Sequence, residues 1–220
     1  MKKAIAFATL LLAAWIAWDL AGPRTHSLRT FDSHEVARLE TATWRSYYDH
    51  QPLKLFGQLT ELLRRQYGFP FWRSVAGAYY AAHAAEVFQA GHQRADYMRA
   101  LPDLVKYYGL IRRTGTEDFD VNRVAALELE WWIIHRERAS HPREDLDRSL
   151  AELQAAIYRT GPEQFTRHAQ ARAEAMLLRD RRAEEAGAPS PGDWNKINDL
   201  LNVSWISLRD AVAVQPARAH

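Results

Sequence analysis

The first 22 residues constrain this chain of 220 residues more than any other segment. An uninterrupted apolar run extends from Ala4 to Trp18, behind Lys2 and Lys3, and Asp19 ends it. As a helix this run is about 22 Å long, and its weak extension to residue 22 brings it to about 28 Å, close to the hydrocarbon thickness of a bilayer. The pattern therefore predicts a membrane-targeting helix over residues 1–22.

The same run has features of an uncleaved signal anchor rather than a removable signal peptide. Signal peptidase sites need small residues three and one positions before the cut, whereas cuts near the end of this run meet Trp15, Ile16, Trp18 or Asp19 there. The two tryptophans also suit the interfacial end of a span. A cleaved signal peptide is the alternative. A buried amphipathic helix is disfavoured because the run has no polar face.

Charges beside the run predict its orientation. Lys2, Lys3 and the amino terminus precede it, and Asp19, Arg24 and Arg29 follow it. The excess of positive charge on the N-terminal side places that end in the cytoplasm and the body outside it. We therefore expect a single-pass protein of the cell membrane, with a signal anchor over 1–22, a linker over 23–32 and an extracytoplasmic helical domain over 33–215.

Composition excludes several classes of function. The chain has 29 basic and 27 acidic side chains, a formal charge of +2, so nothing predicts strong attraction to nucleic acid. It contains no cysteine, which rules out disulfides, iron–sulfur clusters, cysteine zinc fingers and thiol nucleophiles. The sequence also lacks a glycine-rich phosphate loop and the common hydrolase motifs.

Helical spacing of apolar residues runs through the rest of the chain, and no segment alternates like a strand. We predict an all-α, multi-helix bundle of about seven to eight helices. Its predicted segments are a first helix capped by Asp32 or Ser33, then Pro52–Tyr67, Phe71–Ala90, Arg94–Arg113 interrupted at Pro102, Val121–Ala139, Pro142–Tyr158, Gly161–Gly187 and a last helix capped by Asp193 that ends near Val212.

Four ionisable residues lie among apolar helical stripes and are the candidate site. His83 and Glu86 interrupt an apolar helix and share one face with Tyr79, while Glu128 and Glu40 fall on the apolar stripes of two other helices. Inward glutamates and histidines on several helices are typical of divalent transition-metal sites in helical bundles. The spacing here is incomplete, because the His-x-x-Glu order is reversed and no fourth helix supplies such a pair.

The competing interpretation, which we favour, is that arginines neutralise these carboxylates and aromatic side chains hydrogen-bond to them. Arg45, Arg73 and Arg172 lie near the apolar stripes and are the candidate partners. Three further histidines, His141, His168 and His220, are expected at the surface or its boundary.

Two functions follow from these alternatives. The leading prediction is a membrane-anchored, non-catalytic scaffold or protein-interaction module of the cell envelope, which needs no cofactor and binds the membrane and a protein partner but no nucleic acid. The alternative is a bundle, possibly a redox enzyme, that binds a divalent transition metal or a small ligand around His83, Glu86 and Glu128, with Glu40 as a further metal ligand.

Overall fold

A computed structural model describes residues 1–23 and 25–213, and they are almost entirely helical. The helices are α1 Lys2–Ala21, α2 Ser33–Tyr48, α3 Pro52–Tyr67, α4 Phe71–Ala90, α5 Arg94–Tyr97, α6 Leu101–Thr114, α7 Val121–Arg136, α8 Arg143–Tyr158, α9 Thr166–Ala186 and α10 Pro191–Ala213, with short 3₁₀ turns at Met98–Ala100, Arg138–Ser140 and Pro162–Phe165. Within the described residues the only β pairing is an isolated bridge between His26 and Gly115. The predicted all-α bundle behind one N-terminal helix is confirmed.

Local sequence signals explain where most of these helices begin. Asp32 and Asp120 each accept hydrogen bonds from the first-turn amides of α2 and α7, as capping residues do. Pro102 lies in the first turn of α6, so the predicted interruption divides Arg94–Arg113 into α5, a 3₁₀ turn and α6.

One predicted cap is wrong. Asp193 lies inside the first turn of α10 rather than before it. The Ser190 hydroxyl accepts from the Asp193 amide at 3.2 Å, and the Asp193 carboxylate accepts from the Ser190 amide at 3.0 Å. This reciprocal pair is a capping box that satisfies two amides with two side chains.

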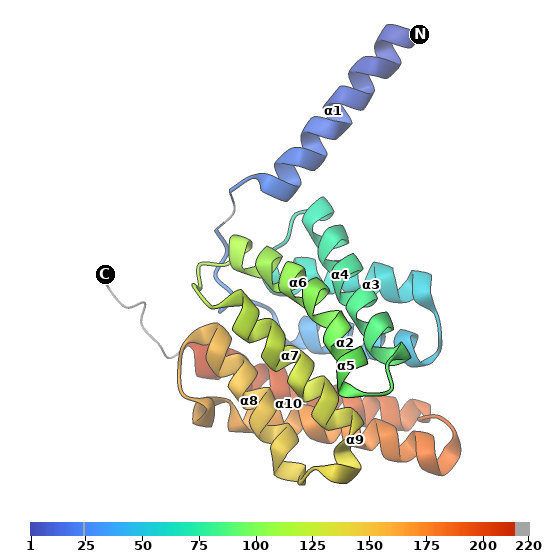
Figure 1. The fold of residues 1–220 in the computed structure, drawn as a ribbon, viewed down its shortest axis with the longest axis vertical. Helices are drawn as coiled ribbons and strands as arrows, with labels where there is room; N and C mark the ends of the chain where they lie inside the picture. Colours follow the sequence, from blue (N-terminus) through green and yellow to red (C-terminus); the bar gives the residue numbers. More distant parts are fainter. Residues whose placement is uncertain (24, 214–220) are drawn as a thin grey trace.

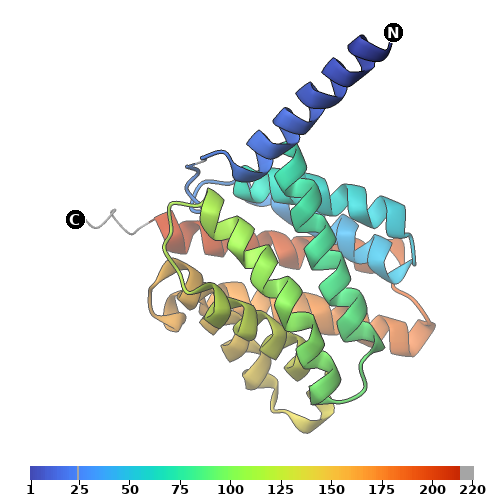
Figure 2. The ribbon, with the colours of Figure 1, turned by 45° about the horizontal axis from the view of Figure 1, so that its top comes forward.

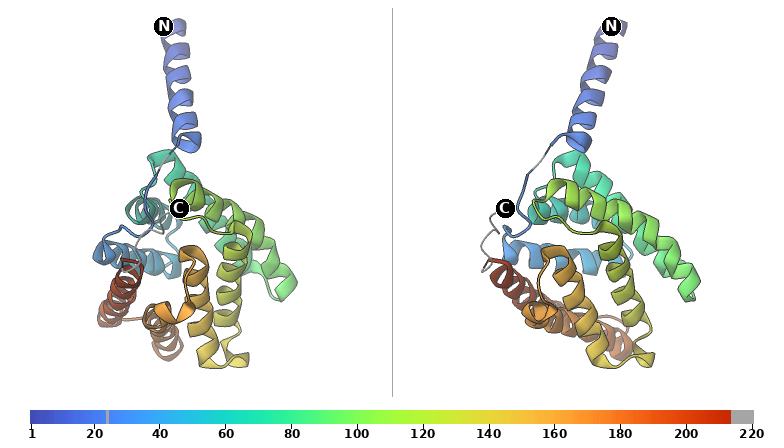
Figure 3. Two further views of the ribbon diagram at one scale, coloured as in Figure 1. Left: turned by 90° about the vertical axis from the view of Figure 1, so that its left-hand side faces the viewer. Right: turned by 60° about the vertical axis from the view of Figure 1, so that its left-hand side comes forward.

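The eight long helices of the body form a closed ring (Figures 1, 2 and 3). Each of α2, α3, α4, α6, α7, α8, α9 and α10 packs against the next in that order, and α10 returns to pack against α2. A single hydrophobic core joins residues from Leu28 to Val212. Side chains that point inward from different helices therefore meet in one interior.

Helix α1 extends away from this ring (Figure 1). It is long and apolar enough to span a membrane, and most of its residues up to Trp18 are exposed. Its contacts with the body are made at its C-terminal end, where it packs against the start of α4. Trp15 stacks on Phe71 with ring centroids 6.2 Å apart and meets Trp72 edge-on at 5.6 Å.

The last turn of α1 is built into the body. Asp19 is buried, and its carboxylate accepts a hydrogen bond from the Trp72 amide at 3.0 Å. The guanidinium of Arg73, which is 1% exposed, donates to the carbonyls of Leu20 and Gly22 at 3.2 and 2.8 Å. It also donates to the Thr114 hydroxyl at 2.8 Å, so α1, α4 and α6 meet at this side chain.

Within the segment predicted as a linker, residues 26–29 pack against the body. Leu28 is 1% exposed and belongs to the core, and its amide donates to the Glu117 carboxylate at 3.0 Å. The Arg29 guanidinium donates to the Val212 carbonyl at 2.9 Å and lies over the Tyr158 ring. His26 also pairs through its backbone with Thr114 and Thr116.

Two truncations distinguish a built-in junction from a dispensable leader. A chain that begins at Asp19 keeps the Arg73 contacts and Leu28, so we expect a soluble, helical protein. A chain that begins at Phe31 loses these carbonyls and a buried leucine, and we expect it to be less stable by about 3 kcal/mol or more, because buried leucines and buried charges each contribute on that scale. Urea unfolding followed by circular dichroism measures the difference. Equal urea midpoints for the two truncated chains would contradict the claim that residues 19–30 stabilise the body.

Candidate functional site

Aromatic and charged side chains from six helices fill the interior of the ring. We call this group the central cluster, and it consists of Glu40 and Trp44 from α2, Tyr67 from α3, Tyr107 and Tyr108 from α6, Glu128, Trp131 and Trp132 from α7, Arg172 from α9 and Trp205 from α10. The ring topology explains why residues so distant in sequence meet there.

Glu40 and Arg172 form the charged centre of this cluster. Glu40 is 4% exposed, and its two carboxylate oxygens have separate partners. The Arg172 guanidinium donates to Oε1 at 2.6 Å and the Trp205 indole donates to Oε2 at 2.6 Å. The bonds to Glu40 thus join α9 and α10 to α2. The contact between α2 and α10 is the one that closes the ring.

Three tryptophans surround the Arg172 guanidinium. Its carbon lies 5.8 Å from the ring centroids of Trp44 and Trp131 and 5.9 Å from that of Trp205. These distances are within the range of cation–π attraction, which is strongest for tryptophan. The cage accounts for a nearly buried charge that has one carboxylate partner.

Glu128 occupies a second position in the central cluster. The Tyr108 hydroxyl donates to its carboxylate at 2.8 Å, and the Trp132 indole donates at 3.0 Å. Burial raises the pKa of Tyr67 and Tyr108 well above the usual tyrosine value, and the nearby Glu128 carboxylate raises it further. These hydroxyls therefore stay protonated and serve as hydrogen-bond donors rather than bases.

His83 and Glu86 lie elsewhere. His83 Nδ1 is 2.6 Å from the Asp103 carboxylate, which also accepts from Lys106 at 3.0 Å, and the His83 ring stacks on Tyr79. Burial acts to raise the pKa of Asp103, but the hydrogen bonds from His83 and Lys106 outweigh it and lower that pKa. The Glu86 side chain faces solvent.

The four candidate metal ligands are therefore divided among separate environments. Glu40 is paired with Arg172, Glu128 is bonded to Tyr108 and Trp132, His83 is bonded to Asp103, and Glu86 is exposed. Across residues 1–23 and 25–213, no three histidine, aspartate or glutamate side chains converge to hold a metal ion. The structure does not bring these four residues together at one place, and the Glu40 carboxylate is paired with Arg172.

The other two candidate arginines behave differently. Arg45 is exposed and lies 3.7 Å from Asp49 on its own helix. Arg73 is buried at the α1 junction, where it bonds backbone carbonyls and Thr114.

The surface placement predicted for His168 is wrong. This residue is 1% exposed, and its Nδ1 donates to the Ser204 carbonyl at 3.1 Å. Burial and the neighbouring Arg172 charge lower its pKa to about 3, while the bond to Ser204 opposes them. His141 is partly buried beside Asp145, and His220 lies outside the described residues.

A second buried ionic group was not predicted. Asp180 lies 3.0 Å from both His135 and Arg179, and Arg138 approaches it at 3.5 Å. The Arg179 guanidinium lies over the Tyr48 ring at 3.1 Å. Asp180 stands in a strongly charged stretch of sequence, which is typical of a solvated helix end, so the sequence carries no signal that this carboxylate turns inward.

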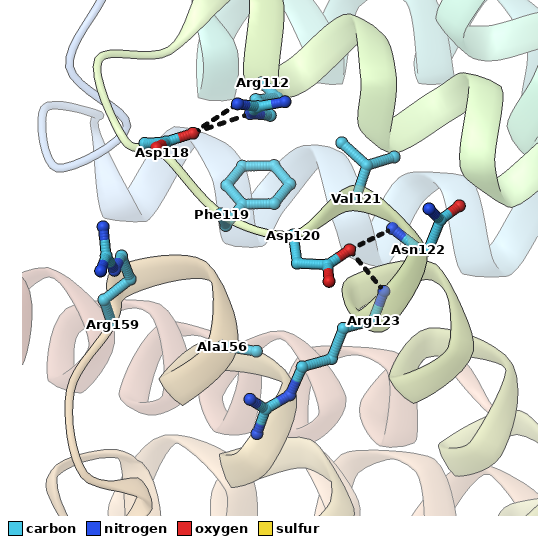
Figure 4. Close-up of a pocket in the computed structure, with 9 residues that line it drawn as sticks. All are labelled: Arg112, Asp118, Phe119, Asp120, Val121, Asn122, Arg123, Ala156 and Arg159. Carbon is cyan, nitrogen blue, oxygen red and sulfur yellow. Dashed lines mark hydrogen bonds and ion pairs between the residues drawn. The ribbon is translucent and has the colours of Figure 1, made fainter.

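A pocket of about 540 Å³ lies where the end of α6 and the start of α7 approach the end of α8 (Figure 4). Arg112 pairs with Asp118 at its rim, Asp120 is occupied in capping α7, and Phe119 is buried beneath. Arg123 and Arg159, which also line the pocket, are exposed. Because all of its charged side chains are exposed, the pocket offers no desolvated group that would select a ligand.

Comparisons with family models, with curated proteins and with solved structures find no significant match. The interpretation of this chain therefore rests on its own residues.

The buried Glu40–Arg172 pair should contribute far more to stability than an exposed pair. Removing one partner leaves a buried charge, so we expect Glu40→Gln or Arg172→Met alone to cost about 3–5 kcal/mol of unfolding free energy. The double variant should lose clearly less than the sum, as a double-mutant cycle measures. The control is Glu35 with Arg38, an exposed pair on α2, whose coupling should stay below about 1 kcal/mol. Equal coupling energies for the two pairs would contradict the claim that the buried Glu40–Arg172 pair stabilises the fold more than an exposed pair does.

The pKa of His168 predicts an acid-sensitive fold. The unfolded histidine binds a proton below about pH 6.5, whereas the folded one stays neutral down to about pH 3, so unfolding takes up a proton between these values. Stability from this group is fully present above pH 6.5 and should fall by about 2 kcal/mol between pH 7.5 and 5. Urea unfolding of the native chain and of His168→Gln at several pH values tests this. The unfolding free energy of His168→Gln should depend less on pH than that of the native chain. The exposed His34→Gln control should keep the pH dependence of the native chain.

Proposed function

We propose that this chain is a single-pass membrane protein whose helical body lies outside the cytoplasm and acts as a non-catalytic module that binds a protein partner at the membrane. The observation that carries the proposal is the contrast within α1. Its apolar length up to Trp18 is exposed, while Asp19, Leu20 and Gly22 at its end are fixed in the body by Trp72 and Arg73. An exposed apolar helix needs a membrane, and a fixed end favours an anchor that is retained.

The interior supports a binding role over a catalytic one. Glu40, Glu128 and His83, the ionisable groups first considered as a site, each have partners that stabilise the fold. A structural network of this kind gives a rigid body with surfaces of fixed shape. The nearly neutral charge favours protein contacts over nucleic acid.

Single cysteines test the topology, since the chain has none of its own. We expect Val203→Cys, an exposed position on α10, to react with a membrane-impermeant maleimide added to intact cells or spheroplasts. The chain should also remain in the membrane fraction after carbonate extraction. Reaction only after lysis would contradict the orientation, and extraction would contradict the anchor.

The same approach tests the partner. A photoreactive group on single cysteines at exposed positions of different helices should give a discrete protein adduct from one surface of the body and not from others. An absence of adducts at every position, together with a rise in melting temperature on adding a transition metal, would overturn the proposal and favour a metal-binding bundle.

A further inference from the structure

The exposed apolar part of α1 is shorter than a bilayer core. Most residues of the helix up to Trp18 are exposed, its ring contacts with the body are made by Trp15, and Asp19 is buried in the junction. The apolar residues from Ala4 to Trp18 span about 22 Å, whereas the hydrocarbon core of a bilayer is about 30 Å thick. Any tilt of the helix makes it shorter still along the membrane normal. If α1 spans the membrane, the part of the body next to Asp19 must therefore lie close to the membrane surface.

The part of the body that meets this end of α1 is aromatic. Phe71, the first residue of α4, is 43% exposed, and Trp72 beside it is half-buried. Both rings contact Trp15, and they also meet each other edge-on at 5.1 Å. Trp18, one turn along α1, is 61% exposed. Together Trp15, Trp18, Phe71 and Trp72 form what we call the aromatic collar.

We infer that the aromatic collar is a second membrane contact, in which the first turn of α4 lies in the interfacial layer of the bilayer and holds the body against it. Tryptophan and other amphipathic aromatic rings concentrate at this layer, and Trp15 fixes Phe71 at its own depth through direct ring contact. The inference rests on the proposed anchor, because α1 must span for the collar to reach lipid.

The junction gives this contact a defined geometry. Arg73 follows the collar directly and bonds the carbonyls of Leu20 and Gly22 as well as Thr114 of α6. The helix that spans the membrane and the ring that carries the partner-binding surface are thus joined without a free hinge at this point. The body has one fixed face toward the lipid, and the opposite end of α4 is turned away from it.

Nitroxide labels on single cysteines in the full chain, reconstituted in phosphatidylcholine vesicles, measure depth through collisions with oxygen and with a water-soluble nickel complex. Phe71→Cys and Trp18→Cys should both lose accessibility to the nickel complex. Tyr79→Cys, two turns further along the same helix and 54% exposed, should keep it, as should Val203→Cys. Leu11→Cys, in the middle of α1, should be the deepest.

Each outcome decides between explanations. Nickel accessibility at residue 71 equal to that at residue 79, with residue 11 buried in lipid, would overturn the collar and leave the anchor intact. Water exposure at residue 11 would instead overturn the proposed anchor. Protection at residue 71 accompanied by dipolar coupling between labels, lost on dilution with unlabelled chain, would mean that a second copy covers this surface and would also overturn the inference.

Discussion

A buried arginine sets the geometry of this protein. The Arg73 guanidinium is 1% exposed and needs several acceptors, because burying a charge without partners is strongly unfavourable. Two of its acceptors are carbonyls at the end of α1 and one is the hydroxyl that ends α6. The α1 helix, α4 and α6 must come together to satisfy it. The end of α1 is consequently part of the fold and not an appendage to it.

The same physical rule organises the interior. Closing eight helices into a ring brings side chains from six of them to one place, and Glu40 and Arg172 are stabilised there by each other and by tryptophans. The cage around Arg172 and the donors on Glu128 leave these groups with structural partners. A rigid ring fixed to the end of α1 suits the proposed module, which would present a surface at a constant orientation to the membrane.

Much of the architecture could be predicted from local patterns. Helical spacing and turn residues predicted the helices of the body, and Asp32 and Pro102 marked real boundaries. The inward positions of Glu40 and Glu128 followed from their stripes, and Arg172 was among the predicted partners. These features depend on residues within a few turns of each other, which is the range over which a sequence pattern is informative.

The errors concern contacts between distant segments. His168 lies in a helix rich in charged residues, so nothing nearby shows that it faces Ser204 on α10. Leu28, in the segment predicted as a linker, is buried in the core, and its amide donates to Glu117, a residue far along the chain that no local pattern connects to it. Arg73 was considered as a partner for a carboxylate of the candidate site, but its place at the junction depends on backbone carbonyls, which no side-chain pattern reveals.

The claim that the end of α1 belongs to the fold is tested most directly by the intact mass of the protein recovered from membranes. If the last turn of α1 is a structural part of the body, the mature chain should keep residues 19–22, and its mass should correspond to an N-terminus at or before Asp19. A mature chain that begins after residue 22 would lack the carbonyls that hold Arg73 and would contradict the account.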